Sequence, residues 1–125
     1  MKKIILTENA PAPIGPYSQA VAVGNMVYCS GQIPLDPKTN QMLTGDIKGQ
    51  TELVMKNIEA LLKAADCQFA NIVKTTIFLT DMKDFPVVNE TYGKYFSQNP
   101  PARSTVQVSA LPKGANVEIE VIAAR

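Results

Sequence analysis

Arg103 begins an alternating run one residue after two prolines, Pro100 and Pro101. The prolines end any helix that precedes them, and residues 103–108 then alternate with the period of two that a β-strand requires. An arginine held at the start of a strand presents a fixed guanidinium, which binds a carboxylate or a phosphate through parallel hydrogen bonds. A solvated arginine at a strand edge is the commoner outcome, so the rest of the chain has to decide between the two interpretations.

Glu118 and Glu120 are the carboxylates best suited to acid–base chemistry. They lie on one side of an alternating run at 117–124, and the chain has no histidine, which excludes histidine triads, histidine metal sites and a histidine base. If the strands of Arg103 and Glu118 pair as a hairpin, both side chains share the face opposite their valine and isoleucine residues. Two interpretations follow: a structural ion pair, or a site in which Arg103 binds a substrate carboxylate and Glu118 activates water.

Four further residues place a polar group, or the space that a glycine leaves, where the strand and helix patterns do not require it. Ser30 and Gly31 lie within a predicted strand, where a glycine permits a ligand, a bulge or a packed neighbour to come close. Tyr17 follows a Gly-Pro turn and either closes over a ligand or is a partly buried aromatic residue. Asn89 interrupts the apolar stripe of a predicted helix, either as a boundary residue bonded to nearby backbone or as a site residue.

The elements that must position these residues form a predicted α+β two-layer sandwich. Two amphipathic helices are enough to cover one face of a mainly antiparallel or mixed sheet, within a single domain of residues 1–125. Several strands are apolar on both sides, which predicts that the second face, with Arg103, Glu118 and Ile122, packs on another subunit. The predicted strands are 2–6, 17–23, 26–33, 71–80, 103–108 and 117–124, and the predicted helices are 47–65 and 85–96.

Composition narrows the partners and the compartment. Hydrophobic residues make up 46% of the chain, so it should fold, and the net charge of +1 without a basic block predicts no nucleic-acid partner. No stretch could span a membrane, and the apolar run at 4–6 is too short for a signal peptide, so we expect a cytoplasmic protein. Cys29 and Cys67 lie far apart, and two free thiols are expected.

Five segments of the chain together resemble the YjgF/RidA family of reactive-imine deaminases. The segments occur in the family's order and cover almost the whole sequence: Ile14–Ala20, Ser30–Pro34, Val88–Asn89, Pro101–Ser104 and Val117–Glu120. The resemblance implies a chorismate-mutase-like fold and a homotrimer with three sites between subunits. It also implies hydrolysis of reactive 2-imino acids, such as 2-iminopropanoate and 2-iminobutanoate, to 2-keto acids and ammonia, without a metal or cofactor.

The resemblance also assigns roles to individual residues. Arg103 matches the arginine that grips the substrate carboxylate, and Glu118 matches the glutamate that positions the attacking water. Thr105 stands where the family often has cysteine, which argues against a thiol step and leaves packing or substrate preference open. The remaining site-lining positions are Tyr17, Ser30, Gly31 and Asn89.

One alternative is a protein that binds the same ligand without converting it. A protein that senses 2-keto acids, or binds them in a regulatory role, would use the same arginine without turnover. Cleavage of RNA, an activity that has been attached to relatives, is disfavoured by the net charge of +1 and by the absence of a basic and aromatic cluster. An assay that generates the imine with an amino-acid oxidase separates the deaminase from the binding protein.

Overall fold

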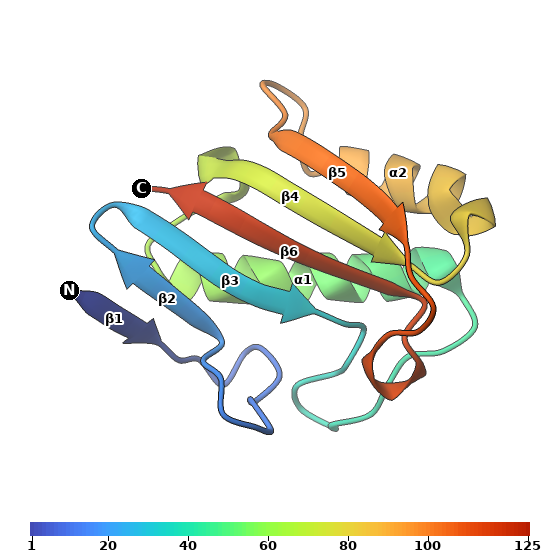
Figure 1. Ribbon diagram of the computed structural model, residues 1–125, viewed down its shortest axis with the longest axis horizontal. Coiled ribbons are helices and arrows are strands. Elements are labelled where there is room, and N and C mark those ends of the chain that lie inside the picture. The colour runs from blue at the N-terminus through green and yellow to red at the C-terminus, as the bar shows by residue number, and fades with distance from the viewer.

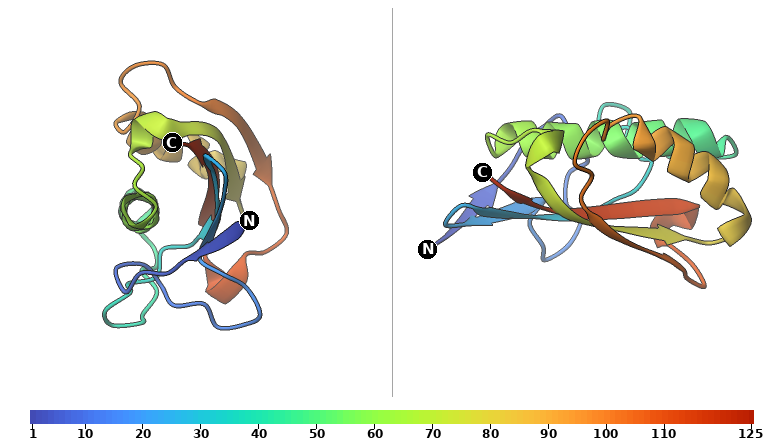
Figure 2. Two further views of the ribbon diagram at one scale, coloured as in Figure 1. Left: turned by 90° about the vertical axis from the view of Figure 1, so that its left-hand side faces the viewer. Right: turned by 90° about the horizontal axis from the view of Figure 1, so that it is seen from above.

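Six strands form one mixed sheet, and two helices cover one of its faces, as Figure 1 and Figure 2 show. The structure is a computed structural model that describes residues 1–125. The order of strands across the sheet is β1-β2-β3-β6-β4-β5. The strands are β1 (Lys2–Ile5), β2 (Ala20–Val23), β3 (Met26–Gln32), β4 (Ile72–Leu79), β5 (Ala102–Gln107) and β6 (Val117–Ala124), and the helices are α1 (Ile47–Ala64) and α2 (Phe85–Gly93).

The predicted α+β two-layer sandwich is confirmed. Helix α1 begins after Asp46, whose carboxylate accepts a hydrogen bond from the Lys48 amide at 3.2 Å. Its apolar stripe is fully buried against the sheet, with Val54 and Ile58 among the residues that have no exposed surface. Both helices lie on the same side of the sheet (Figure 2). Neither helix combines the length and the apolar composition that crossing a membrane requires.

The predicted hairpin between the strands of Arg103 and Glu118 is wrong. Strand β5 pairs with β4 in parallel, because helix α2 carries the chain back along the sheet between the two strands. Strand β6 pairs antiparallel with both β3 and β4 and so occupies the middle of the sheet. Its inward residues Val117, Ile119, Val121 and Ala123 are all buried, as a central strand requires.

The parallel pairing turns Arg103 toward the helices. Residues that are paired across neighbouring strands point to the same face, and Arg103 pairs with Thr75, which is buried on the helix side. Glu118 alternates with the buried Val117 and Ile119 and therefore points to the other face. The prediction that Arg103 and Glu118 share the outer face is thus wrong, and the core side of β5 carries the arginine instead of Val106.

The face without helices carries an apolar row across four strands. Ile4, Val21, Tyr28 and Ile122 are successive cross-strand partners in this row. Ile4 is 51% exposed and Tyr28 is 46% exposed, although both side chains are largely apolar. Monomeric proteins rarely leave such a contiguous apolar surface in water. The row therefore agrees with the expectation that this face packs on another subunit.

Candidate active site

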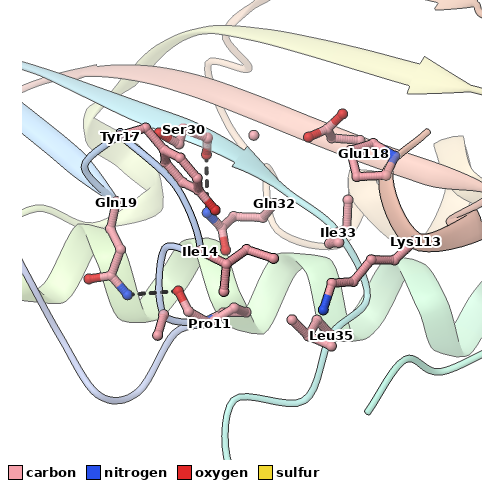
Figure 3. Close-up of a pocket in the computed structure, with 13 residues that line it drawn as sticks. Pro11, Ile14, Tyr17, Gln19, Ser30, Gln32, Ile33, Leu35, Lys113 and Glu118 are labelled. Carbon is pink, nitrogen blue, oxygen red and sulfur yellow. Dashed lines mark hydrogen bonds between the residues drawn. The ribbon is translucent and has the colours of Figure 1, made fainter. Parts of the chain in front are cut away.

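A cavity of about 360 Å³ brings together four of the residues that the sequence analysis selected. Tyr17, Ser30, Gly31 and Glu118 all line it, and they come from the loop before β2, from β3 and from β6. Figure 3 shows the carboxylate of Glu118 extending toward the side on which Tyr17 and Ser30 lie. The cavity therefore joins a carboxylate, a phenol and a hydroxyl at one surface of the sheet.

Gly31 leaves the space that the Glu118 carboxylate occupies. A methyl group on the Cα of Gly31 would lie 2.5 Å from Oε2 of Glu118, which is too close for any real contact. The pairing register of β3 with β6 also shifts between Cys29 and Gln32, so a bulge surrounds this glycine. Both interpretations of Gly31, a bulge and a close approach, thus apply, and together they bring Glu118 against the β3 backbone.

Glu118 is a carboxyl group whose surroundings favour the neutral form. Burial raises the pKa of Glu118 above its ordinary value, and the negative charge of Glu120 on the same face raises it further. Glu120 itself is exposed. A carboxylate with a raised pKa is a stronger base than an exposed one and accepts a proton more readily near neutral pH. Of the two candidate glutamates, only Glu118 lines the cavity.

Arg103 lies in a second cluster, which helix α2 holds. Its guanidinium donates a hydrogen bond of 2.7 Å to Oδ1 of Asn89, so the unexpected polar residue on the α2 stripe bonds a side chain and not nearby backbone. The guanidinium carbon also lies 5.4 Å from the ring centre of Phe85 and 5.2 Å from that of Tyr92. The hydroxyl of Tyr92 is held in turn by Thr75 at 2.7 Å. Arg103 is thus oriented on three sides without any carboxylate among its hydrogen-bond partners.

Thr105 adds an unused hydroxyl to the Arg103 cluster. Thr105 follows Arg103 by two residues on β5 and points to the same face. Its Oγ1 is buried and has no hydrogen-bond partner in the chain. A buried hydroxyl without a partner costs about 1–3 kcal/mol, so native proteins seldom leave one. A ligand or a second subunit that supplies the partner would remove this cost.

The two clusters lie apart in one chain. Arg103, Asn89 and Thr105 do not line the cavity, and strand β4 separates β5 from β6. At a strand spacing of about 4.8 Å, the axes of β5 and β6 are roughly 10 Å apart. Arg103 and Glu118 also point to opposite faces of the sheet. A small acid bound to the Arg103 of one chain therefore does not reach the Glu118 of that chain.

Several cavity residues gave little signal in the sequence. Gln19 and Gln32 line the cavity and are both buried, although glutamine is usually exposed. Lys113 also lines it and adopts a left-handed backbone conformation, with φ of 56°. Such a conformation in a residue other than glycine is a pointer that only the structure supplies. The sequence analysis thus selected the chemically reactive residues of the cavity, and it missed residues that shape the cavity walls.

Neither metal ligands nor reactive thiols accompany these clusters. No three His, Cys, Asp or Glu side chains gather where they could hold a metal ion. Cys29 and Cys67 are free and buried, as expected for free thiols. Burial, with a smaller contribution from Cys67, raises the pKa of Cys29 to about 12, so the thiolate that a nucleophile needs is not formed near neutral pH.

Comparison with known proteins identifies the relatives of this chain. The family model described as Endoribonuclease L-PSP matches residues 7–125. The chain belongs to this family, the YjgF/RidA/RutC family. A RutC family protein from Pyrococcus horikoshii is 53% identical over 98% of this chain and 98% of its own length. The human 2-iminobutanoate/2-iminopropanoate deaminase is 49% identical over 98% of this chain and 90% of its own length.

Solved structures of the YjgF/RidA/RutC family share the fold closely. The crystal structure of Escherichia coli TdcF with bound serine is 44% identical and superposes with a TM-score of 0.94, covering 98% of both chains. The resemblance to the YjgF/RidA family is therefore confirmed, and with it the α+β fold. Members carry different names, from deaminase to RutC family protein, so the activity of this member has to be argued from its own residues.

In this family member, replacing Glu118 by glutamine should stabilise the fold at neutral pH. Because the folded-state pKa of Glu118 is raised, the folded protein becomes less stable as the pH rises from the ordinary value of 4.5 through the raised value. Glu118→Gln removes that penalty. Urea midpoints should be higher than those of the parent protein at about pH 7 and should converge with them at about pH 4. The exposed Glu90→Gln is the control, and an equal gain at both pH values would contradict the explanation.

Gly31→Ala should displace the Glu118 carboxylate without unfolding the protein. The clash involves the mobile end of a side chain, so Glu118 can rotate away from β3 toward water. Its pKa should then fall toward the ordinary value, and the urea midpoint at about pH 7 should not decrease, because alanine is tolerated where φ is not positive. Titration of the Glu118 carboxyl carbon by NMR measures this shift. Gly93→Ala, which has no neighbour within 4 Å at its new methyl group, should leave that titration unchanged.

Proposed function

We propose that this chain hydrolyses reactive 2-imino acids, such as 2-iminopropanoate and 2-iminobutanoate, to 2-keto acids and ammonia in the cytoplasm. The observation that carries the proposal is the combination of Arg103, a preoriented cation beside a hydroxyl without a partner, with Glu118, a base of raised pKa in a cavity. A relative at 49% identity bears the name of this activity, and another relative was crystallised with serine, itself a small amino acid.

The chemistry needs a proton acceptor and an oriented substrate. The carbon of a protonated imine is already electrophilic, so a water oxygen can bond to it while Glu118 takes one proton from that water. Glu118 returns this proton to the nitrogen of the resulting carbinolamine. The carbon–nitrogen bond then breaks as the hydroxyl oxygen passes its proton to the Glu118 carboxylate, and the nitrogen leaves as ammonia. The carbonyl that remains belongs to the 2-keto acid. A positioned base contributes about 10²- to 10⁴-fold to such a rate, and holding the reactants together contributes more.

Arg103 supplies the orientation in this proposal. A charge-assisted hydrogen bond between the guanidinium and the substrate carboxylate is worth about 1.5–3 kcal/mol. Asn89, Phe85 and Tyr92 hold the guanidinium, so little side-chain entropy is lost when the substrate binds. The hydroxyl of Thr105 gains its missing partner from the same carboxylate. Tyr17, Ser30 and Gly31 line the other side of the bound substrate.

The proposed site forms between two copies of the chain. Since Arg103 and Glu118 lie in separate clusters on opposite faces, we infer that the Arg103 cluster of one subunit covers the Glu118 cavity of the next. The surfaces that meet are then different, and contacts of this kind, repeated head to tail, form a ring when the rotation between subunits closes. A homotrimer with three sites between subunits fits this requirement. The apolar row Ile4, Val21, Tyr28 and Ile122 supplies the surface to be buried.

Glu118→Gln should lower turnover much more than Glu120→Gln does. Glutamine keeps the shape and the hydrogen bonds of Glu118 but removes the base, so kcat should fall by about 10²-fold while pyruvate still binds. Glu120 is exposed and outside the cavity, so its replacement should cost far less. The two variants are compared by kcat and by pyruvate affinity at matched oligomeric state. Equal losses would assign the chemistry to the wrong glutamate, and pyruvate binding without turnover in the parent protein would favour the sensor.

Mixed assemblies should test the shared site directly. Arg103→Ala and Glu118→Gln should each be nearly inactive, because one loses the carboxylate contact and the other loses the base. Refolding the two together in equal amounts should restore about a quarter of the parent activity, since a site is intact when its arginine and its glutamate come from the appropriate variants. Ammonia release from 2-iminopropanoate is the measurement. No recovery in mixtures that form the same assemblies would place both residues in one subunit.

A further inference from the structure

Gln19 is a buried residue whose side-chain amide forms all of its hydrogen bonds with the loop before it. It is 1% exposed and stands just before β2. Its Oε1 accepts a hydrogen bond of 2.8 Å from the Thr7 amide. Its Nε2 donates to the carbonyl oxygens of Thr7 at 3.0 Å, Ala10 at 3.2 Å and Pro11 at 2.9 Å. The amide thus replaces the secondary structure that segment 7–11 lacks.

The same residue is tied to the opposite wall of the cavity. The carbonyl oxygen of Gln19 accepts a hydrogen bond of 2.9 Å from the Ser30 amide. The hydroxyl of Ser30 donates to the neighbouring carbonyl oxygen of Ser18 at 2.6 Å. Ser30 precedes Gly31, whose missing side chain leaves room for Glu118. Gln19 therefore links the loop that carries Tyr17 to the bulge beside the base.

We propose that Gln19 is a positioning residue that sets the distance between these two walls and thereby the affinity for substrate. The loop that it holds contributes Pro11, Ile14 and Tyr17 to the cavity, while Glu118 belongs to the central strand β6. Figure 3 shows the Gln19 amide bonded to Pro11 below the ring of Tyr17. When the amide is lost, the loop wall moves and the base does not. The effect on substrate rests on the proposed function, whereas the effect on the loop does not.

Two replacements separate the hydrogen bonds from the volume. Gln19→Met keeps the length of the side chain and removes every hydrogen bond. Gln19→Glu keeps the acceptor for the Thr7 amide but sets a carboxylate against three carbonyl oxygens, so it should be at least as severe. Asn71→Ala is the control, because it removes a side chain that donates to Ala124 and accepts from Gln68, neither of which lines the cavity.

The first measurements need no turnover. Hydrogen exchange of the Thr7 amide should accelerate at least tenfold in both Gln19 variants and stay unchanged in Asn71→Ala. The chain has no tryptophan, so Ile14→Trp provides a single fluorescent reporter in the loop wall. Ile14 is already exposed, so the readout is mobility: the fluorescence anisotropy of this tryptophan should fall when Gln19→Met is added. Unchanged exchange and unchanged anisotropy would overturn the proposal, whether or not the protein proves to be a deaminase.

The kinetic measurement addresses the consequence for substrate. In both Gln19 variants KM for 2-iminopropanoate and Kd for pyruvate should rise about tenfold, while kcat changes less than threefold, because uniform binding is lost and the base stays in place. A loss of kcat with unchanged KM would overturn the assignment, as would equal effects in Asn71→Ala. If the parent protein binds pyruvate without turnover, the rise in Kd alone tests the same prediction. If it neither binds nor turns over, the loop measurements still decide the positioning role.

Discussion

The parallel pairing of β5 with β4 is the constraint on which the candidate site depends. Helix α2 joins these strands and returns the chain to the same end of the sheet, so Arg103 pairs with the buried Thr75 and faces the helix layer. Asn89, Phe85 and Tyr92 can then grip the guanidinium from α2. Had β5 paired with β6 as a hairpin, Arg103 would face Glu118 as an internal ion pair, and neither charge would be free for a ligand.

Buried side-chain amides form hydrogen bonds with the loops around the cavity, which lack the regular hydrogen bonds of helices and strands. Gln19 holds the loop that carries Tyr17, and Asn57 on α1 donates to the carbonyl oxygens of Ile33 at 3.2 Å and Leu35 at 3.0 Å. Gln50, also on α1, donates to Oδ1 of Asn116 at 3.0 Å, just before β6. Each of these three loops is therefore held by one buried side-chain amide, which forms hydrogen bonds with the backbone of the loop or with one of its side chains. A cavity built from loops gains its rigidity from these bonds, because loops have few hydrogen bonds of their own.

The sequence predicted the elements and most of the reactive residues, but it did not predict how the last strands pair. Alternation identified β6 at its observed bounds and the Arg103 strand to within one residue. Alternation states which residues share a face of one strand, whereas the choice of core face depends on contacts between distant segments. Val106 of β5 therefore looked like a core residue, although it is 42% exposed on the uncovered face. Gln19 was missed because its burial follows from loop contacts that no local pattern records.

The proposed arrangement places the substrate between the cation and the base. Burial and the charge of Glu120 raise the pKa of Glu118 in a single subunit. In that arrangement the neighbouring guanidinium pairs with the substrate carboxylate and not with the Glu118 carboxylate. Glu118 therefore keeps the raised pKa that its own subunit gives it. The separation of cation and base onto two surfaces thus lets the ligand stand between them, where Arg103 binds its carboxylate and Glu118 activates the water.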